Sequence, residues 1–290
     1  MRLMSLHCGT LDRVFFKLYG RLPEIKAKEG ISTVIATVII TGIMLTVVTV
    51  ALYYSTSLID MNKQFMEYEN VKGLLTYAAT ALEQVSFGTG GSRYVRFSLT
   101  STRINFETRS ETLRVKINNV EVSEAVFKPG RIVACGGALV TTVPRLLYPE
   151  NSTYGALEHA LEKLIVGPGE STVIVYENFT KGACAFMETY RVRVIYNGNI
   201  TVKEEGVNRN YNFYTVHVLK LGFKTVGGSG TIPVVFRNIR ETVIERRTSS
   251  QVSLTVELGP KYCTTRLPGK EDADGSIVIV KITEIEVSTA

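Results

Sequence analysis

An uncharged stretch from residue 31 to residue 59 constrains this chain more than any other feature of its sequence. Isoleucine, valine and threonine dominate the stretch, and no Asp, Glu, Lys or Arg interrupts it. A helix needs about 20 apolar residues to cross the hydrocarbon core of a bilayer. β-Branched residues favour strands in water, but within lipid only a helix satisfies every backbone group internally. We therefore expect a membrane-spanning helix.

The positive charge of the chain supports an orientation for this helix. The formal net charge is +6, and residues 1–30 alone carry six basic and three acidic side chains. Half of the excess therefore precedes the apolar stretch, where it indicates a cytoplasmic N-terminus and a large C-terminal part outside the membrane. Nucleic-acid binding needs basic residues concentrated on one face of the folded part, so we expect no nucleic-acid partner.

The helical pattern continues beyond the apolar stretch. After Asp60, apolar or aromatic residues recur every three or four positions, which predicts an amphipathic helix. These residues are Met61, Phe65, Tyr68, Val71, Leu75, Ala78, Leu82 and Val85. The glycine-rich segment 88–91 then favours an end to the helix. We expect one helix over residues 31–87 whose second half packs against a head domain.

The remaining residues, 92–290, show strand-like patterns separated by turn signals. The predicted strands are 93–99, 113–122, 172–179, 190–196, 211–221, 232–236, 252–258 and 277–287. The Asn197-Gly198 pair predicts a hairpin turn, and residues 154–165 predict one short helix. The expected fold class is α+β: a long N-terminal helix, like the handle of a lollipop, followed by an all-β, sandwich-like head or two smaller lobes.

The junction before the apolar stretch carries a motif. Lys26-Ala27-Lys28-Glu29-Gly30 is followed directly by Ile31-Ser32-Thr33-Val34-Ile35. This junction resembles the class III signal peptide of archaeal type IV pilin and archaellin precursors. In that family a membrane peptidase cuts after the small residue, so the resemblance implies a leader over residues 1–30 and a mature chain that begins at Ile31. A secretory signal peptide has a much shorter apolar segment.

Two departures from the family pattern are visible. Bacterial pilins carry a Glu five residues into the mature chain, and Ile35 occupies that position here. The charge pairing that sets subunit register in those pilins is therefore not available to this chain. The leader of 30 residues is also longer than is usual in the family.

The resemblance implies a structural subunit of an archaeal surface filament, used for adhesion or cell-surface contact. Its apolar helices would leave the cytoplasmic membrane and pack into the filament core, with the heads outside the cell. The implied partners are further copies of the chain, the prepilin peptidase, the pilus assembly ATPase and the membrane platform protein. Close packing of helices needs small side chains. The candidates are Thr33, Ala36, Thr37, Thr41, Gly42 and Thr46.

Other interpretations of the same layout stay open. The threonines can instead bond back to carbonyls of their own helix. The chain can be a single-span accessory or minor pilin, an archaellum component, or an anchored extracellular binding module that does not polymerise. A membrane-anchored hydrolase is a further alternative that the sequence supports less well.

The part of the chain expected outside the membrane contains cysteines that can form a disulfide and sequons that can be glycosylated. After leader removal, Cys135, Cys184 and Cys263 remain, which allows one intramolecular disulfide in any of three pairings. Three Asn-x-Ser/Thr sequons predict possible glycosylation of Asn151, Asn178 and Asn199. Three Gln residues and no Trp, with many charged residues, hint at a thermophilic source.

Signals for catalysis are sparse. We interpret His159 as a surface helix residue without a second metal ligand at helical spacing, and His217 as a strand residue. The cysteine spacings match no metal site, and no phosphate loop or dinucleotide fingerprint occurs. We therefore expect no enzymatic activity, no metal and no cofactor.

Overall fold

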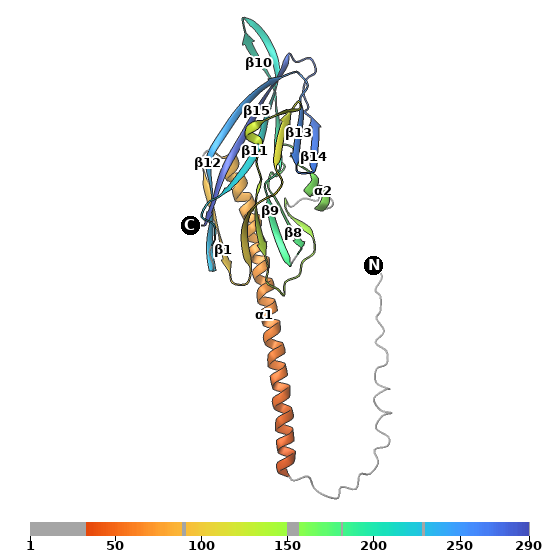
Figure 1. The fold of residues 1–290 in the computed structure, drawn as a ribbon, viewed down its shortest axis with the longest axis vertical. Helices are drawn as coiled ribbons and strands as arrows, with labels where there is room; N and C mark the ends of the chain where they lie inside the picture. The colour runs from red at the N-terminus through yellow and green to blue at the C-terminus, as the bar shows by residue number, and fades with distance from the viewer. Residues whose placement is uncertain (1–32, 89–90, 150–156, 181, 228–229, 290) are drawn as a thin grey trace, which may run out of the picture. The chain divides into compact units, whose positions relative to one another are not determined.

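The computed structural model describes residues 33–88, 91–149, 157–180, 182–227 and 230–289. The chain divides into two compact units, residues 1–57 and 58–290. The first described element is helix α1 (Thr33–Phe87), whose 55 residues confirm the predicted helix and its end at Phe87. A mostly β head follows, so the predicted α+β class is confirmed. The ribbon is drawn in Figure 1.

The head contains fifteen described strands and two short helices. The strands are β1 (Ser92–Leu99), β2 (Arg103–Thr108), β3 (Leu113–Ile117), β4 (Val120–Glu121), β5 (Gly130–Cys135), β6 (Arg145–Tyr148), β7 (Ile165–Val166), β8 (Ile174–Phe179), β9 (Ala183–Glu188), β10 (Val192–Glu204), β11 (Val207–Phe223), β12 (Gly230–Thr248), β13 (Ser253–Leu258), β14 (Lys261–Arg266) and β15 (Gly275–Thr289). The helices are the 3₁₀ turn η1 (Ser123–Ala125) and α2 (Leu157–Glu162).

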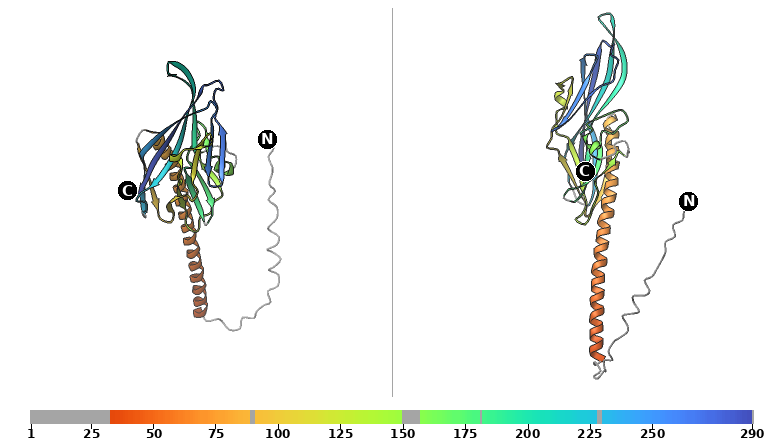
Figure 2. Two further views of the ribbon diagram at one scale, coloured as in Figure 1. Left: turned by 45° about the horizontal axis from the view of Figure 1, so that its top comes forward. Right: turned by 90° about the vertical axis from the view of Figure 1, so that its right-hand side faces the viewer.

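These strands form three sheets. A six-stranded sheet has the order β1-β12-β15-β11-β10-β7, and within it β11 and β15 run parallel. A four-stranded sheet has the order β14-β13-β3-β4, and a five-stranded sheet has the order β2-β5-β9-β8-β6. Two views in Figure 2 show the second half of α1 lying along the sheets of the head. Within the head, the second half of α1 shares a hydrophobic cluster with the six-stranded and five-stranded sheets.

The long strands β11 and β15 bury one face at one end and the opposite face at the other end. Val278 and Val280 belong to the cluster shared with the four-stranded sheet, whereas Ile285 and Val287 belong to the cluster that contains α1. Even-numbered and odd-numbered residues of a strand point to opposite faces. One sheet therefore supplies one layer to two different sandwiches, which explains why both faces of residues 277–287 are apolar in sequence.

The predicted hairpin turn at Asn197-Gly198 is wrong. Strand β10 runs through both residues, and its register against β11 shifts there as a bulge, with a φ of 99° at Gly198. The turn lies further on, at Glu205-Gly206, where both φ angles are positive as a type I′ turn requires. Glycine with positive φ suits a bulge as well as a turn, so the dipeptide alone does not distinguish them. The β10 hairpin reaches beyond its neighbours in Figure 1.

Several predicted boundaries also shift. Residues 113–122 do not form one strand, because Asn118 and Asn119 adopt φ angles of 48° and 66° and turn the chain from β3 into β4. Strand β12 is far longer than the predicted 232–236. Helix α2 is shorter than the predicted 154–165, of which 154–156 lie outside the described residues.

Candidate functional site

The first half of α1 presents its side chains to the surroundings on every side. From Thr33 to Ile59 all side chains are exposed except that of Ala36, which is half-buried. Val34 is 67% exposed and Tyr53 is 79% exposed. By length and composition, α1 is able to cross a membrane, and it is the one helix among the described residues with this property. So large an apolar surface marks a site of contact with lipid or protein.

The predicted packing residues lie within this exposed half. The hydroxyl of Thr37 donates to the carbonyl of Thr33 at 2.7 Å, and the hydroxyl of Thr41 donates to the carbonyl of Thr37 at 2.7 Å. Thr46 likewise donates to the carbonyl of Gly42 at 2.9 Å. In a single copy these threonines therefore bond to their own helix, as the alternative interpretation expected. A shallow groove beside Gly42 is lined by Thr37, Val38, Thr41 and Leu45.

The second half of α1 packs into the head. Its buried residues are Tyr68, Val71, Lys72, Leu75, Ala78, Ala79, Ala81, Leu82, Val85 and Ser86. The predicted apolar stripe is thus buried from Tyr68 onward, but Met61 and Phe65 remain 41% and 47% exposed. The head buries the stripe only from Tyr68 onward, so the first two members of the stripe stay exposed in the described part of one copy.

A buried ion pair joins the helix to the five-stranded sheet. Lys72 Nζ lies 3.0 Å from Glu177 Oε2 and 2.7 Å from Glu69 Oε1. Arg145 bonds the other oxygen of Glu177, and the hydroxyl of Tyr68 donates to Glu177 at 3.5 Å. Burial opposes ionisation of Glu177, but its hydrogen bonds and the charge of Lys72 outweigh burial and lower its pKa. Burial and the charge of Glu177 raise the pKa of Tyr68.

A second carboxylate of the helix holds the β1–β2 turn. The backbone N–H groups of Thr100 and Thr102 donate to Glu67 Oε1 at 2.7 Å and 2.9 Å, and the hydroxyl of Ser101 donates to Oε2 at 2.8 Å. Burial opposes ionisation here too, but the hydrogen bonds from the turn outweigh it and lower the pKa of Glu67 to about 2. The charged form of Glu67 therefore fixes the turn to the helix.

A third carboxylate, that of Glu83, fixes the segment before β8. The backbone N–H of Thr172 donates to Glu83 Oε1 at 2.6 Å, and the hydroxyl of Ser171 donates to the same atom at 2.7 Å. The hydroxyl of Tyr148 donates to Glu83 Oε2 at 2.9 Å. Glu67, Lys72 and Glu83 thus connect about five turns of helix to three separate parts of the head.

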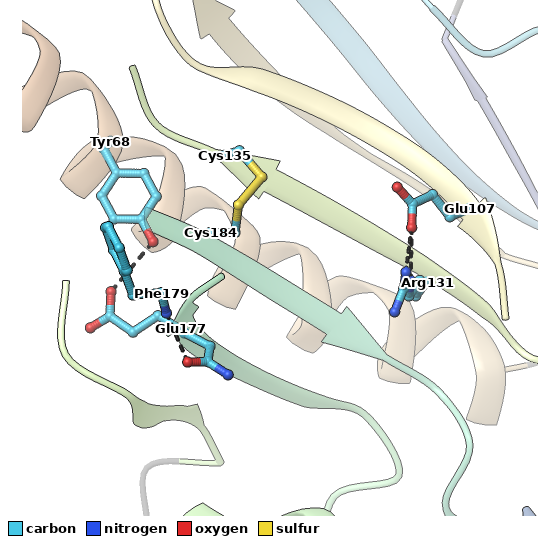
Figure 3. The surroundings of a disulfide bond; sticks show 8 residues. Tyr68, Glu107, Arg131, Cys135, Glu177, Phe179 and Cys184 are labelled. Carbon is cyan, nitrogen blue, oxygen red and sulfur yellow. Dashed lines mark hydrogen bonds and ion pairs between the residues drawn. A yellow bond between two sulfur atoms is a disulfide. The ribbon is translucent and has the colours of Figure 1, made fainter. Parts of the chain in front are cut away.

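The disulfide lies beside the seat of the helix. Cys135 and Cys184 form a disulfide between β5 and β9, where the two residues are directly paired. Of the three pairings that the sequence allows, the structure therefore has Cys135–Cys184. Figure 3 draws the bond with Tyr68 and Glu177 in its surroundings. A Cβ atom at Gly136 would lie 3.1 Å from the ring of Tyr68, so the chain after Cys135 packs closely on the helix. Cys263 is a half-buried free thiol.

The end of α1 contacts one of the two candidate histidines. The rings of Phe87 and His217 meet edge to face with their centroids 5.2 Å apart. Burial lowers the pKa of His217 to about 4, helped by the positive charges of Lys281 and Arg193. His217 lies in β11 and His159 is exposed on α2. No group of three metal-ligating side chains occurs in the part of the chain that the structure describes.

Two of the three sequons are described. Asn178 is half-buried near the end of β8, and its Oδ1 accepts a hydrogen bond from the N–H of Phe179 at 2.8 Å. Asn199 is exposed in β10, and its Nδ2 donates to Oδ1 of the buried Asn212 at 2.9 Å. Asn151 and the predicted cleavage site, with Lys28, Glu29, Gly30 and Ile31, lie outside the described residues.

Sequence reasoning missed the polar anchors Glu67, Lys72 and Glu83. A signal was present for one of them, since Lys72 follows Tyr68 by four positions and so lies on the apolar face of the predicted helix. No sequence pattern pairs it with Glu177, because the two residues are 105 positions apart. Comparisons with family models, curated proteins and solved structures found no match to this chain.

Proposed function

We propose that this chain is the structural subunit of an archaeal type IV pilus-like surface filament. Its leader, residues 1–30, is removed on the cytoplasmic side, and the helix from Ile31 holds the mature subunit in the membrane. Withdrawn from lipid, this helix packs against the same helix of other copies and forms the filament core. The heads then lie outside, where they mediate adhesion or contact between subunits.

The observation that carries the proposal is that every side chain from Thr33 to Ile59 except that of Ala36 is exposed. A solitary anchor also exposes apolar side chains to lipid, so the class III junction at Gly30 is what favours assembly over plain anchoring. The three polar anchors, Glu67, Lys72 and Glu83, hold the head on the helix. A pull on the helix is therefore passed to the head, as a filament subunit requires.

The forces that hold these helices together in a filament core differ from those in a helical bundle of a soluble protein. Moving the helix from lipid to a protein core gains little hydrophobic energy, so small residues have to permit close approach. The groove beside Gly42 offers one such place. Extracellular placement is also compatible with the disulfide, because disulfides persist in oxidising compartments.

One observation favours the alternative of a non-polymerising anchor. The hydroxyls of Thr37, Thr41 and Thr46 donate to carbonyls of their own helix and leave no donor for a neighbouring copy. An accessory pilin, an archaellum component or an anchored binding module would need nothing more from these residues.

Shearing surface filaments from cells that make this chain tests the proposal. We expect the chain in the sheared fraction with Ile31 as its first residue. A chain that stays entirely with the membrane after shearing, or one that still carries residues 1–30, contradicts it. As a control, a Gly30→Phe variant should remain uncleaved and absent from the filaments, because a bulky residue blocks the peptidase.

A further inference from the structure

Exposed apolar side chains gather where the helix enters the head. We name this surface the base patch and define it by five residues: Met61 and Phe65 of α1, Leu139 and Val143 of the loop between β5 and β6, and Phe179 at the end of β8. Val143 is 75% exposed and Phe179 is 52% exposed. Several exposed apolar side chains near one another mark an interaction site in soluble domains.

Contacts within the head hold the loop members of the base patch at the helix. The N–H of Leu139 donates to Gln64 Oε1 at 3.3 Å, one turn before Tyr68. Thr142 and Arg145, on either side of Val143, both bond the buried Glu177. Phe179 follows Glu177 by two residues and lies in the surroundings drawn in Figure 3. The patch is therefore a fixed surface of the head and not a set of independent loop tips.

The base patch lies above the hydrocarbon of the membrane. From Thr33 to Tyr53 the helix is about 30 Å long, which matches the roughly 30 Å hydrocarbon core. Tyr53 and Tyr54 are of the residue type that prefers the membrane–water interface. Met61 follows Tyr54 by about 10 Å of helix and Phe65 by about 16 Å. While a single copy is held in the membrane, the patch thus faces water.

This position matters for the energetics of assembly. Apolar side chains that leave lipid for protein gain little, whereas apolar side chains that leave water gain free energy in proportion to their buried area. The membrane-embedded part of α1 moves from lipid to protein, whereas the base patch moves from water to protein. Burial of the base patch can therefore favour the transfer of the subunit from the membrane into a filament, which burial of the apolar helix alone does not favour.

We propose that the base patch is a subunit contact, covered in the filament by the uncharged helix of a second copy, and that its burial drives the subunit out of the membrane. The helix is the matching partner because it is apolar on all sides, has no charge from residue 31 to residue 59 and is itself unpartnered in the described part of one copy. This inference rests on the proposed filament function.

Charge substitutions in the base patch test the contact. Val143→Asp and Phe179→Asp alter side chains that are already exposed, so the head should fold and the mature subunit should reach the membrane. We expect at least a tenfold loss of filaments, with normal leader cleavage and a protease-resistant head. The matched control is Tyr262→Asp on β14, whose side chain is 77% exposed outside the patch and should assemble normally.

The outcomes separate this inference from the proposed function. If wild type assembles and both patch variants assemble equally well, the patch is not a subunit contact although the filament function stands. Equal loss in the Tyr262→Asp control also overturns the assignment, because any added charge would then suffice. If wild type itself forms no filaments, the proposed function fails and the patch inference fails with it.

Tryptophan fluorescence tests the occupant, because the chain has no Trp of its own. In a Phe179→Trp variant the emission should resemble that of exposed tryptophan in nanodiscs that hold one copy, and should shift to the blue in filaments. A blue shift already present in single-copy nanodiscs means that lipid covers the patch and overturns the proposal. An emission that does not shift in filaments also overturns the proposal, because it means that no second copy covers the patch.

Discussion

The ammonium group of Lys72 lies 3.0 Å from Oε2 of Glu177, and the two side chains are only 6% and 2% exposed. The pair links α1 to β8 across 105 positions of sequence. A buried ion pair contributes little net stability compared with an apolar pair, but its geometry is demanding and its disruption is costly. Lys72 lies about two turns beyond Phe65 of the base patch, so the pair is a fixed point of the helix–head junction.

Lys72→Met should lower the free energy of unfolding of the full chain in detergent by about 3 kcal/mol, because it removes the buried cation of Glu177 and leaves the carboxylate with the exposed Arg145. Denaturant titration followed by circular dichroism measures the change. Lys63→Met, on an exposed position of the same helix, should change the free energy little. The double variant Lys72→Met/Glu177→Gln should lose less than the sum of the single variants. Strict additivity would show that the two groups do not interact.

Glu67→Gln should weaken the β1–β2 turn in a pH-dependent way. The folded pKa of Glu67, about 2, lies below the ordinary value of 4.5. Its contribution to stability is therefore fully present above about pH 4.5 and is lost as the pH falls toward 2. We expect wild type to exceed the variant by about 1–2 kcal/mol at pH 7 and to match it near pH 2.

The control for this prediction is Glu158→Gln, an exposed carboxylate of α2. Unfolding free energies of wild type and both variants are compared at several pH values between 2 and 7. A difference for Glu67→Gln that does not change with pH would mean that the charge of the carboxylate is not what holds the turn.

Removal of the disulfide should destabilise the head. Cys135 and Cys184 are separated by 49 residues, so the bond restricts a long loop in the unfolded chain. The Cys135→Ala/Cys184→Ala variant should lose about 2–4 kcal/mol of unfolding free energy in denaturant titrations. Cys263→Ala, which alters a half-buried free thiol, should cost less than about 1 kcal/mol. If Cys263→Ala lowers the unfolding free energy as much as Cys135→Ala/Cys184→Ala does, the loss comes from changed packing and not from the missing crosslink.

Gly42→Leu should block assembly without releasing the subunit from the membrane. The substitution fills the groove beside Thr37 and Thr41, where close approach of a second helix needs a small residue. Leucine remains compatible with lipid, so the membrane fraction should contain normal amounts of mature chain. Val47→Leu, elsewhere on the same exposed helix, is the matched control and should still form filaments. Normal filament yield from Gly42→Leu would exclude this groove from the subunit contact.

The sequence predicts the helix well because two patterns agree over it. The uncharged stretch is long enough to cross a membrane, where only a helix satisfies the backbone, and the apolar stripe that continues it follows a helical period and ends beside a glycine cluster. The sequence also suggests which side of the second half is buried. It does not indicate where burial begins, because Phe65 and Tyr68 look alike in a periodic pattern and only the extent of the head distinguishes them.

The head is predicted less completely. Its strand content follows from β-branched and aromatic residues, but the division into three sheets depends on pairings between distant segments such as β1 with β12. Gly198 illustrates a local failure, since positive φ serves a bulge there and a turn at Gly206. The anchors Glu67 and Glu83 were not predicted for the same reason as the sheets: their partners are 33 to 110 positions away.

A helical reconstruction of surface filaments by electron cryo-microscopy tests the central claim most directly. The account predicts that residues 31–59 of neighbouring copies are packed against one another at the filament axis, with the β-rich heads outside. Filaments that lack this chain, or a reconstruction in which this segment contacts no other copy, would contradict it.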